Sequence, residues 1–160
     1  MLVVMSETGA ELYEVFRHIR PMHQLSARVV AAGLAHRDVS MPVRAVIEHV
    51  HDAGPQTVPQ IARALWITRQ GVQRLVDEGK ELGYLEARPN PGHRRSHLIA
   101  ATGAGRAVYE SLHDEELTRL DRIAAGLDAD DINACVRVLA HVVHELGALD
   151  ALLTPTKEDQ

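Results

Sequence analysis

Cysteine and aromatic residues are scarce in this sequence. Cys135 is the only cysteine, which excludes an intramolecular disulfide and any zinc site built from several cysteines. Aromatic residues make up 3% of the 160 positions, with one tryptophan, Trp66, and one phenylalanine, Phe16. So few rings argue against a protein that holds single-stranded nucleic acid by stacking its bases.

Motifs for export and for catalysis are also missing. The opening MLVVM is apolar, but it lacks the basic segment and the longer apolar core of a secretory signal, so we expect a cytoplasmic protein. There is no phosphate-binding glycine loop, no GxSxG and no HExxH, and no spacing selects a set of Ser, His and Asp. We therefore expect neither an enzyme nor a cofactor. The composition, 46% hydrophobic and 24% charged, is typical of a soluble globular protein and gives no indication of a membrane partner.

Positive charge is concentrated in one part of an acidic chain. The formal net charge is -5, yet residues 60–110 contain eight Lys or Arg against five Asp or Glu, while the remainder contains nine against 17. Ordinary charge scatter over a solvated surface also produces such a split. The alternative is a basic face presented to a polyanion, because local potential steers association more than net charge does.

The first third of the chain has the periodicity of amphipathic helices. Apolar residues recur every three or four positions over 11–35, where Pro21 is expected to kink the helix or split it in two. Ser40 is expected to cap the next helix, with Pro42 in its first turn and Gly54 at its end. The buried stripe of this second helix is predicted to be Val43, Val46, Ile47 and Val50.

Two short helices and a hairpin follow. The pattern predicts helices over 58–65 and from a cap at Thr68 to about 82, joined so tightly that they must cross at a large angle, as in a helix-turn-helix. Beyond Gly83, two extended runs at 84–88 and 97–100 flank a turn rich in Pro, Asn and Gly. A helix-turn-helix followed by a β-hairpin is a winged helix.

Two long helices complete the predicted fold. Thr102 is expected to cap a helix over about 103–125, and Asp128 one over about 130–153, in which Cys135 lies near the apolar side and is expected to be buried. The fold class is therefore mainly α: a winged helix-turn-helix with a short β-hairpin wing, flanked by long helices at both ends.

The middle of the chain resembles the MarR family (multiple antibiotic resistance regulators) of bacterial transcription factors. The residues that carry the resemblance are TVPQIARALWITRQGVQRLVDEGKELGYLEARPNPGHRRSHLIAAT, at 57–102, together with the step from Thr102 to Gly105. The resemblance implies a homodimer that binds a pseudo-palindromic, double-stranded DNA operator as a repressor and is released by a small-molecule effector. It also implies the following domains: an N-terminal dimerisation helix (1–38), a DNA-binding domain (39–102), C-terminal dimerisation helices (103–153) and a frayed tail (154–160).

Three residues depart from the pattern of the family. His93 stands where members usually carry an Asp just before two wing arginines, which removes an anchor for an arginine. Gly79 takes a position usually filled by a core leucine, and Trp66 one that is usually small. We expect these departures to change local packing without changing the fold.

The predicted helix that begins at Thr68 carries side chains suited to the major groove. Its candidate DNA-binding residues are Thr68, Arg69, Gln70, Gln73 and Arg74. Arg can donate two bonds to guanine and Gln can pair with adenine, although the same residues also suit the polar side of any surface helix. The wing adds His93, Arg94 and Arg95, of which Arg95 is the candidate for insertion into a narrow minor groove. Arg63 and Arg88 are candidates for phosphate contacts or for surface ion pairs.

Ten histidines prompt an alternative, a metal- or haem-responsive sensor. The pair His49 and His51 is a poor chelate on a helix, whereas His141 and His144 share a face, but no spacing fixes a third ligand. By the resemblance, His18 and His23 are candidates for an effector pocket between the first helix and the winged-helix domain. Redox sensing through Cys135 would require an exposed thiolate.

A winged helix that only mediates protein association is the other alternative. It would have no need of the Gln70, Gln73 and Arg74 face or of the two wing arginines.

Overall fold

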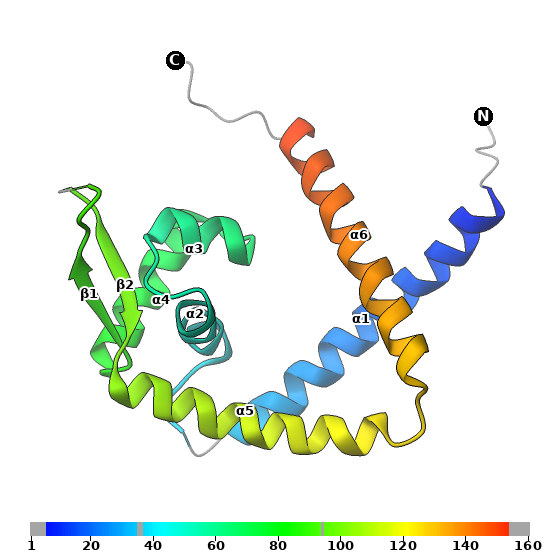
Figure 1. Ribbon diagram of the computed structural model, residues 1–160, viewed down its shortest axis with the longest axis horizontal. Helices are drawn as coiled ribbons and strands as arrows, with labels where there is room; N and C mark the ends of the chain where they lie inside the picture. The colour runs from blue at the N-terminus through cyan, green and yellow to red at the C-terminus, as the bar shows by residue number, and fades with distance from the viewer. Residues whose placement is uncertain (1–5, 35–36, 94, 154–160) are drawn as a thin grey trace. The chain divides into compact units, whose positions relative to one another are not determined.

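The computed structural model describes residues 6–34, 37–93 and 95–153. Its elements are α1 (Glu7–Leu34), α2 (Met41–Asp52), α3 (Val58–Leu65), α4 (Arg69–Glu81), β1 (Leu85–Pro89), β2 (His97–Ala101), α5 (Gly103–Ala124) and α6 (Ala129–Leu153), as Figure 1 shows. The two strands form an antiparallel hairpin in which Leu85 pairs with Ala101 and Pro89 with His97. This is the predicted winged helix-turn-helix with long helices on either side.

The chain divides within α5 into two compact units, residues up to 116 and residues from 117 onward. The core lies in the first unit, where α2, α3, α4 and the hairpin pack together. Its fully buried side chains are Val43, Val46, Ile47, Ile61, Val72 and Val76. The stripe predicted for the second helix, Val43, Val46, Ile47 and Val50, is confirmed as buried.

Short side chains with hydroxyl groups fix where these helices begin. Ser40 caps α2, its Oγ accepting from the Val43 N–H at 3.4 Å, and Pro42 occupies the first turn, where no backbone donor is needed. Thr68 caps α4 in the same way, its Oγ1 accepting from the Gly71 N–H at 3.0 Å. The predicted caps are therefore confirmed, and α3 spans the predicted residues.

The joint between α3 and α4 passes through an unusual backbone conformation. Trp66 ends α3 with φ 56° and ψ 36°, in the left-handed region. Its N–H, and that of Ile67, bond back to the carbonyl of Ala62, which closes the last turn of α3. A residue with a Cβ pays roughly 1–2 kcal/mol in this conformation.

The core has no room for a larger side chain at Gly79, where the family usually has a leucine. Gly79 is buried on α4, and a Cβ added there would lie 2.6 Å from Leu85 Cδ1 and 3.4 Å from Val43 Cγ1. The Leu85 side chain of β1 thus fills the space that a residue on α4 would otherwise take.

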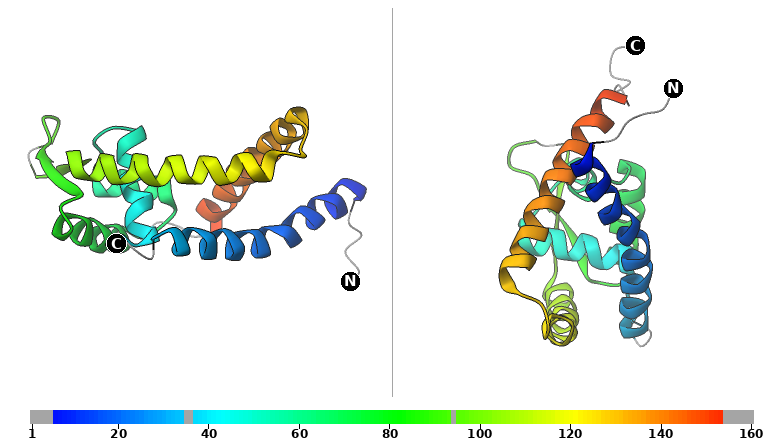
Figure 2. Two further views of the ribbon diagram at one scale, coloured as in Figure 1. Left: turned by 90° about the horizontal axis from the view of Figure 1, so that it is seen from below. Right: turned by 90° about the vertical axis from the view of Figure 1, so that its right-hand side faces the viewer.

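Of the two outcomes expected at Pro21, a kink or a split, the structure shows no split. Residues 7–34 form one continuous helix, which begins earlier than the predicted residue 11 and bends without breaking (Figure 2). A proline inside a helix removes one backbone donor and is a usual cause of such a bend. Only the C-terminal end of α1 joins the core, through Leu34 and the partly buried Val30.

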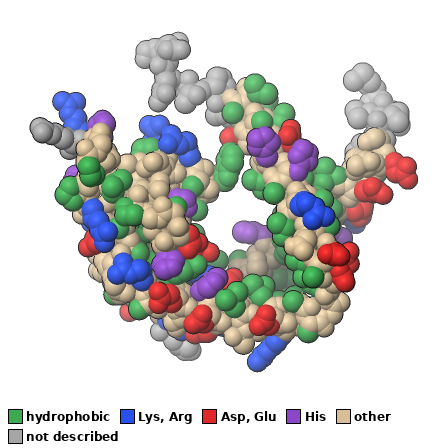
Figure 3. Space-filling model, in the orientation of Figure 1, with side chains coloured by type: hydrophobic (Ala, Val, Ile, Leu, Met, Phe, Trp, Pro, Cys, Tyr) green, Lys and Arg blue, Asp and Glu red, His purple; other side chains and the backbone are tan. Residues whose placement is uncertain are grey.

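The side chains of helix α6 are largely exposed. None of its residues, all of which the structure describes, is buried, and Val136, Leu146 and Leu149 are about half exposed. Figure 3 shows hydrophobic side chains along α6, with histidines among them. Cys135 is exposed too, so the expectation of its burial is wrong for the single chain. No helix among the described residues is long and apolar enough to cross a membrane.

Candidate nucleic-acid interface

Helix α4 has one buried face and one polar, exposed face. Val72 and Val76 point into the core. The exposed face carries the predicted residues Thr68, Arg69, Gln70, Gln73 and Arg74. Gln73 donates to Asp77 Oδ1 at 3.0 Å, one turn further along the helix. The structure therefore brings the predicted set together at the N-terminal end of one helix, with the amide of Gln73 oriented by a neighbouring carboxylate.

The wing exposes the second predicted set. Arg95 and His93 are both exposed at the tip of the hairpin. Arg94 lies outside the described residues, so its assignment remains a prediction. Arg95 lies in the turn, two residues before β2 begins at His97.

Asn90 and Ser96, which the sequence pattern did not single out, hold the wing tip in shape. Asn90 Nδ2 donates to Ser96 Oγ at 2.8 Å across the turn, and Asn90 Oδ1 accepts from the Gly92 N–H at 3.0 Å. The N–H of Ser96 bonds to the carbonyl of His93 at 3.1 Å. These bonds order the tip without the aspartate that family members usually carry there. Asn in a turn is the available sequence signal, because its side chain bonds to nearby backbone.

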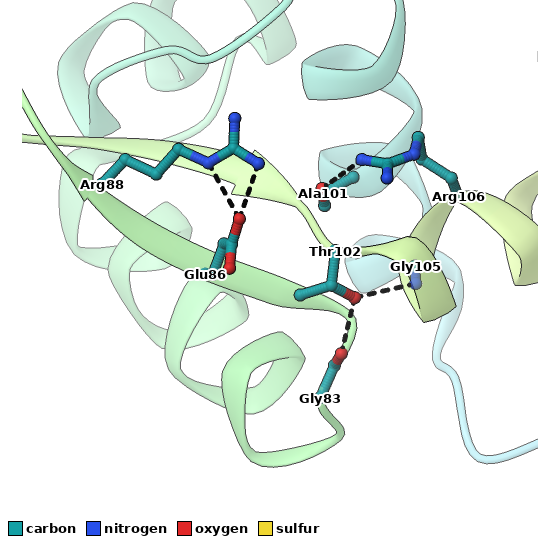
Figure 4. Close-up of polar contacts among 7 residues, drawn as sticks. All are labelled: Gly83, Glu86, Arg88, Ala101, Thr102, Gly105 and Arg106. Carbon is teal, nitrogen blue, oxygen red and sulfur yellow. Dashed lines mark hydrogen bonds and ion pairs between the residues drawn. The ribbon is translucent and has the colours of Figure 1, made fainter.

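The base of the wing is tied to the start of α5 (Figure 4). Thr102 Oγ1 donates to the Gly83 carbonyl at 2.7 Å and accepts from the Gly105 N–H at 3.0 Å. Arg106 Nη1 donates to the Ala101 carbonyl at 2.9 Å. The predicted cap at Thr102 is confirmed, and the same hydroxyl also joins the end of the hairpin to the residue after α4.

Gly105 sits against the backbone at this joint. A Cβ added there would lie 2.1 Å from the carbonyl oxygen of Tyr84, closer than any two such atoms approach. Only glycine allows the first turn of α5 to lie so near to the Tyr84 carbonyl, just before β1.

The two candidate phosphate contacts differ in their surroundings. Arg88 forms an ion pair with Glu86 on the same strand, with Nε 2.8 Å from Oε1. Arg63 is exposed on α3 and lines a cavity of about 440 Å³ together with Asn90 and His93 of the wing tip. Of the two, Arg63 lies next to the wing residues, whereas Arg88 would have to exchange its carboxylate partner for a phosphate.

Basic side chains also line a cavity of about 290 Å³ between α3, α4 and the hairpin. They are Lys80, Arg95 and His97, and Gln73 lies beside them. This cavity connects the polar face of α4 with the wing. The residues predicted on two separate elements therefore border a common surface.

A cluster of aromatic and charged groups lies away from this surface, where α2 meets α5. The Tyr109 ring stands between His51 and His113, with centroid separations of 4.7 and 5.4 Å. Burial, followed by the carboxylates of Glu48 and Asp52, raises the pKa of Tyr109 above its ordinary value of 10.0.

The same region holds the buried charge of the core. Arg44 is 6% exposed and forms an ion pair with Glu116. Its Nε has no partner among the described residues. The sequence pattern of α2 did not predict that Arg44 is buried. The pattern identifies the apolar side of the helix but does not show which residue of α5 pairs with a charge beside it.

The histidines predicted for an effector or a metal are not gathered into a site. His18 and His23 are exposed on α1, where His18 Nδ1 is 2.8 Å from the Glu14 carbonyl oxygen, and neither lines the cavities above. His141 and His144 are exposed on α6. Within the part of the chain that the structure describes, no three His, Cys, Asp or Glu side chains are grouped to hold a metal ion.

The chain is similar over most of its length to known proteins. A model of the MarR family matches residues 37–96. Over 144 residues, which cover 90% of this chain and 98% of the relative, the chain is 31% identical to the protein Rv2011c of Mycobacterium tuberculosis. The crystal structure of a MarR family transcription regulator superposes with a TM-score of 0.76 at 26% identity, over 88% of this chain and 93% of that chain.

A further solved structure shares the fold. It is a mutant of the E. coli protein MarR complexed with operator DNA, with a TM-score of 0.69 and 23% identity, over 86% of this chain and 99% of that chain. The winged helix, the capped step from the wing into α5 and the matches in sequence and structure agree: the chain belongs to the MarR family of winged-helix transcriptional regulators.

Proposed function

We propose that this protein is a transcriptional repressor that binds double-stranded operator DNA as a homodimer, with α4 in the major groove and the wing in the adjacent minor groove. The observation that carries the proposal is the exposed polar face of α4, bordered by the basic side chains of the wing. The E. coli relative with this fold is complexed with operator DNA, which supports the same class of partner.

Base readout is assigned to the first two turns of α4. Arg74 suits a guanine, to which it can donate two bonds, and Gln70 suits an adenine. Gln73 can also pair with an adenine once its hydrogen bond to Asp77 is broken. Thr68 and Arg69 lie where the free N–H groups of the helix start favour a phosphate.

The wing is assigned to the minor groove. Arg95 inserts where a narrow groove concentrates negative potential, with Arg94 and His93 on the flanking backbone. Arg63 and Arg88 are assigned to phosphates. These contacts position the protein and make its affinity depend on salt, whereas α4 supplies the sequence preference.

Dimerisation is assigned to the helices at the two ends, residues 1–38 and 103–153, around the DNA-binding domain at 39–102. The apolar side chains left exposed on α6 support this assignment, since a second copy would remove them from water. A two-fold dimer reads half-sites about one helical turn apart. A small-molecule effector that changes the separation of the two α4 helices would release the DNA, and a site for it near His18 and His23 remains part of the proposal. Because the proposed target is the operator DNA of a bacterial gene, the protein is assigned to the cytoplasm.

The test is fluorescence anisotropy with labelled duplexes from the region upstream of the gene and from a randomised pool after selection, in a salt series. We expect one duplex to bind far more tightly than random DNA. Arg74→Ala should cost about 1–3 kcal/mol of binding free energy on that duplex and reduce its affinity advantage over random DNA. Arg95→Ala should reduce the slope of affinity against salt. Arg137→Ala, which removes the same charge from an exposed position on α6 opposite its Leu146 side, is the matched control.

The proposal fails under a clear result. If no duplex from either source binds better than random DNA, and Arg74→Ala and Arg95→Ala behave like Arg137→Ala, neither surface reads DNA.

A further inference from the structure

Trp66 combines two features that are unfavourable for a tryptophan. It is the only residue other than glycine with positive φ among the described residues, at 56°, while Gly54 and Gly83 occupy the other such positions. It is also 62% exposed, although it is the largest apolar side chain in the protein. A bulky residue in this conformation is a genuine outlier.

Neither feature is explained by the contacts of the described residues. The end of α3 is closed by the backbone N–H groups of Trp66 and Ile67, which glycine would supply equally well and without strain. Trp66 is not among the side chains that form or border the core. Strain that persists without an internal contact to explain it is typical of functional sites.

The position of Trp66 connects it with the proposed DNA surface. It precedes the α4 cap Thr68 by two residues and lines an open groove of about 670 Å³ with Ile67, Arg74 and Pro42. Between residues 60 and 76 the chain carries Arg63, Arg69 and Arg74 and no acidic residue. Glu78, which also lines the groove, accepts a hydrogen bond from Ser40 Oγ at 2.9 Å.

We propose that Trp66 is a contact to the DNA backbone, its indole ring lying against a deoxyribose at the edge of the major groove and its Nε1–H donating to a phosphate. The indole has an apolar body and a single donor with no acceptor, which matches the apolar face of a sugar beside an anionic oxygen. Arg74 in the groove, and Arg63 and Arg69 close by along the chain, favour a polyanion over a second apolar protein surface. This inference rests on the proposed function and assigns Trp66 to positioning, because sugar and phosphate are the same at every base pair.

The single tryptophan makes the contact directly observable. Excited at the long-wavelength edge of the indole absorption band, where the three tyrosines do not absorb, the wild-type protein gives fluorescence from Trp66 alone. On saturation with the selected duplex, we expect its emission to change and its quenching by neutral acrylamide to fall. Unchanged quenching at saturation would overturn the proposal while leaving DNA binding itself intact.

Trp66→Gly separates a DNA contact from a structural role. Glycine relieves the left-handed strain, so thermal stability should be retained or increased. Affinity should fall about tenfold on the selected duplex and on random DNA alike, since a backbone contact carries no sequence information. Trp66→Phe keeps an aromatic ring and loses the N–H donor, so its affinity should lie between those of the wild type and Trp66→Gly.

Three other outcomes decide against the inference. If Trp66→Gly binds as tightly as the wild type while Arg74→Ala is weakened, Trp66 is not a contact and the regulator proposal stands. If Trp66→Gly lowers the melting temperature, the residue is structural. A wild-type protein that binds no duplex would instead remove the proposed function and this role together.

Discussion

The winged-helix elements and helix α6 are both rich in Leu, Val and Ile, but they bury them very differently. Val43, Ile61 and Val72 are 0% exposed within the first unit, whereas Leu146 and Leu149 of α6 are 49% and 52% exposed. Helix α5 shows both kinds of surface, since its first half contains the buried Tyr109 and Leu112 and its second half the exposed Leu120 and Ile123. The winged helix therefore buries its apolar side chains within its own chain, whereas α6 leaves them exposed, as the proposed dimer would require.

The largest effect is expected from a charge placed on the uncovered apolar side of α6. In Leu146→Glu, two copies per dimer would each lose about 2 kcal/mol of apolar burial, which together weaken association by roughly a thousandfold. Sedimentation equilibrium should show a monomer whose winged helix remains folded, and operator affinity should fall because half-sites are no longer bound as pairs.

Ala148→Glu is the matched control for this change. Ala148 is also exposed, and it lies two residues further on, about 200° around the helix from Leu146. The same charge on that side should leave the dimer intact. Equal dissociation by both variants would show that α6 has no specific apolar interface, and an unaffected Leu146→Glu dimer would place the interface elsewhere.

The next largest effect is expected in the winged-helix unit, at the base of the wing. Gly105→Ala would put a Cβ 2.1 Å from the Tyr84 carbonyl oxygen, so the wing and α5 must move apart, at a cost of about 3 kcal/mol. Denaturant unfolding at a fixed protein concentration measures the loss. At Gly103 a Cβ would meet only Arg106 Nη2, at 3.9 Å, so Gly103→Ala should be neutral or stabilising. If the two alanine variants are equally stable, the close approach at the wing base does not constrain α5.

The same contrast explains which parts of the structure could be predicted from sequence. The bounds of α3 and the caps Ser40 and Thr68 follow from local chemistry, because a hydroxyl at a helix start bonds within three residues of itself. The polar face of α4 follows from helical periodicity. Each of these depends on neighbours along the chain.

Features that depend on distant residues could not be read in the same way. Nothing near Gly105 indicates that the Tyr84 carbonyl lies against it, and nothing near Arg44 indicates its ion pair with Glu116. The burial expected for Cys135 failed for a related reason, since periodicity shows that one side of a helix is apolar but not which molecule covers it.

The smallest effect concerns Tyr109, at the last covered turns of α5. Because its pKa is raised by burial and by the carboxylates of Glu48 and Asp52, the folded protein holds the phenol proton more tightly than the unfolded chain. This stability is fully present below the unfolded pKa of about 10 and is lost as pH rises through the folded value. We expect the free energy of unfolding to fall more steeply between about pH 9 and pH 11 for the wild type than for Tyr109→Phe, with the difference between them at neutral pH as the internal reference. A difference that stays constant across that range would mean that water reaches the ring, and that the covered surface of α5 ends before Tyr109.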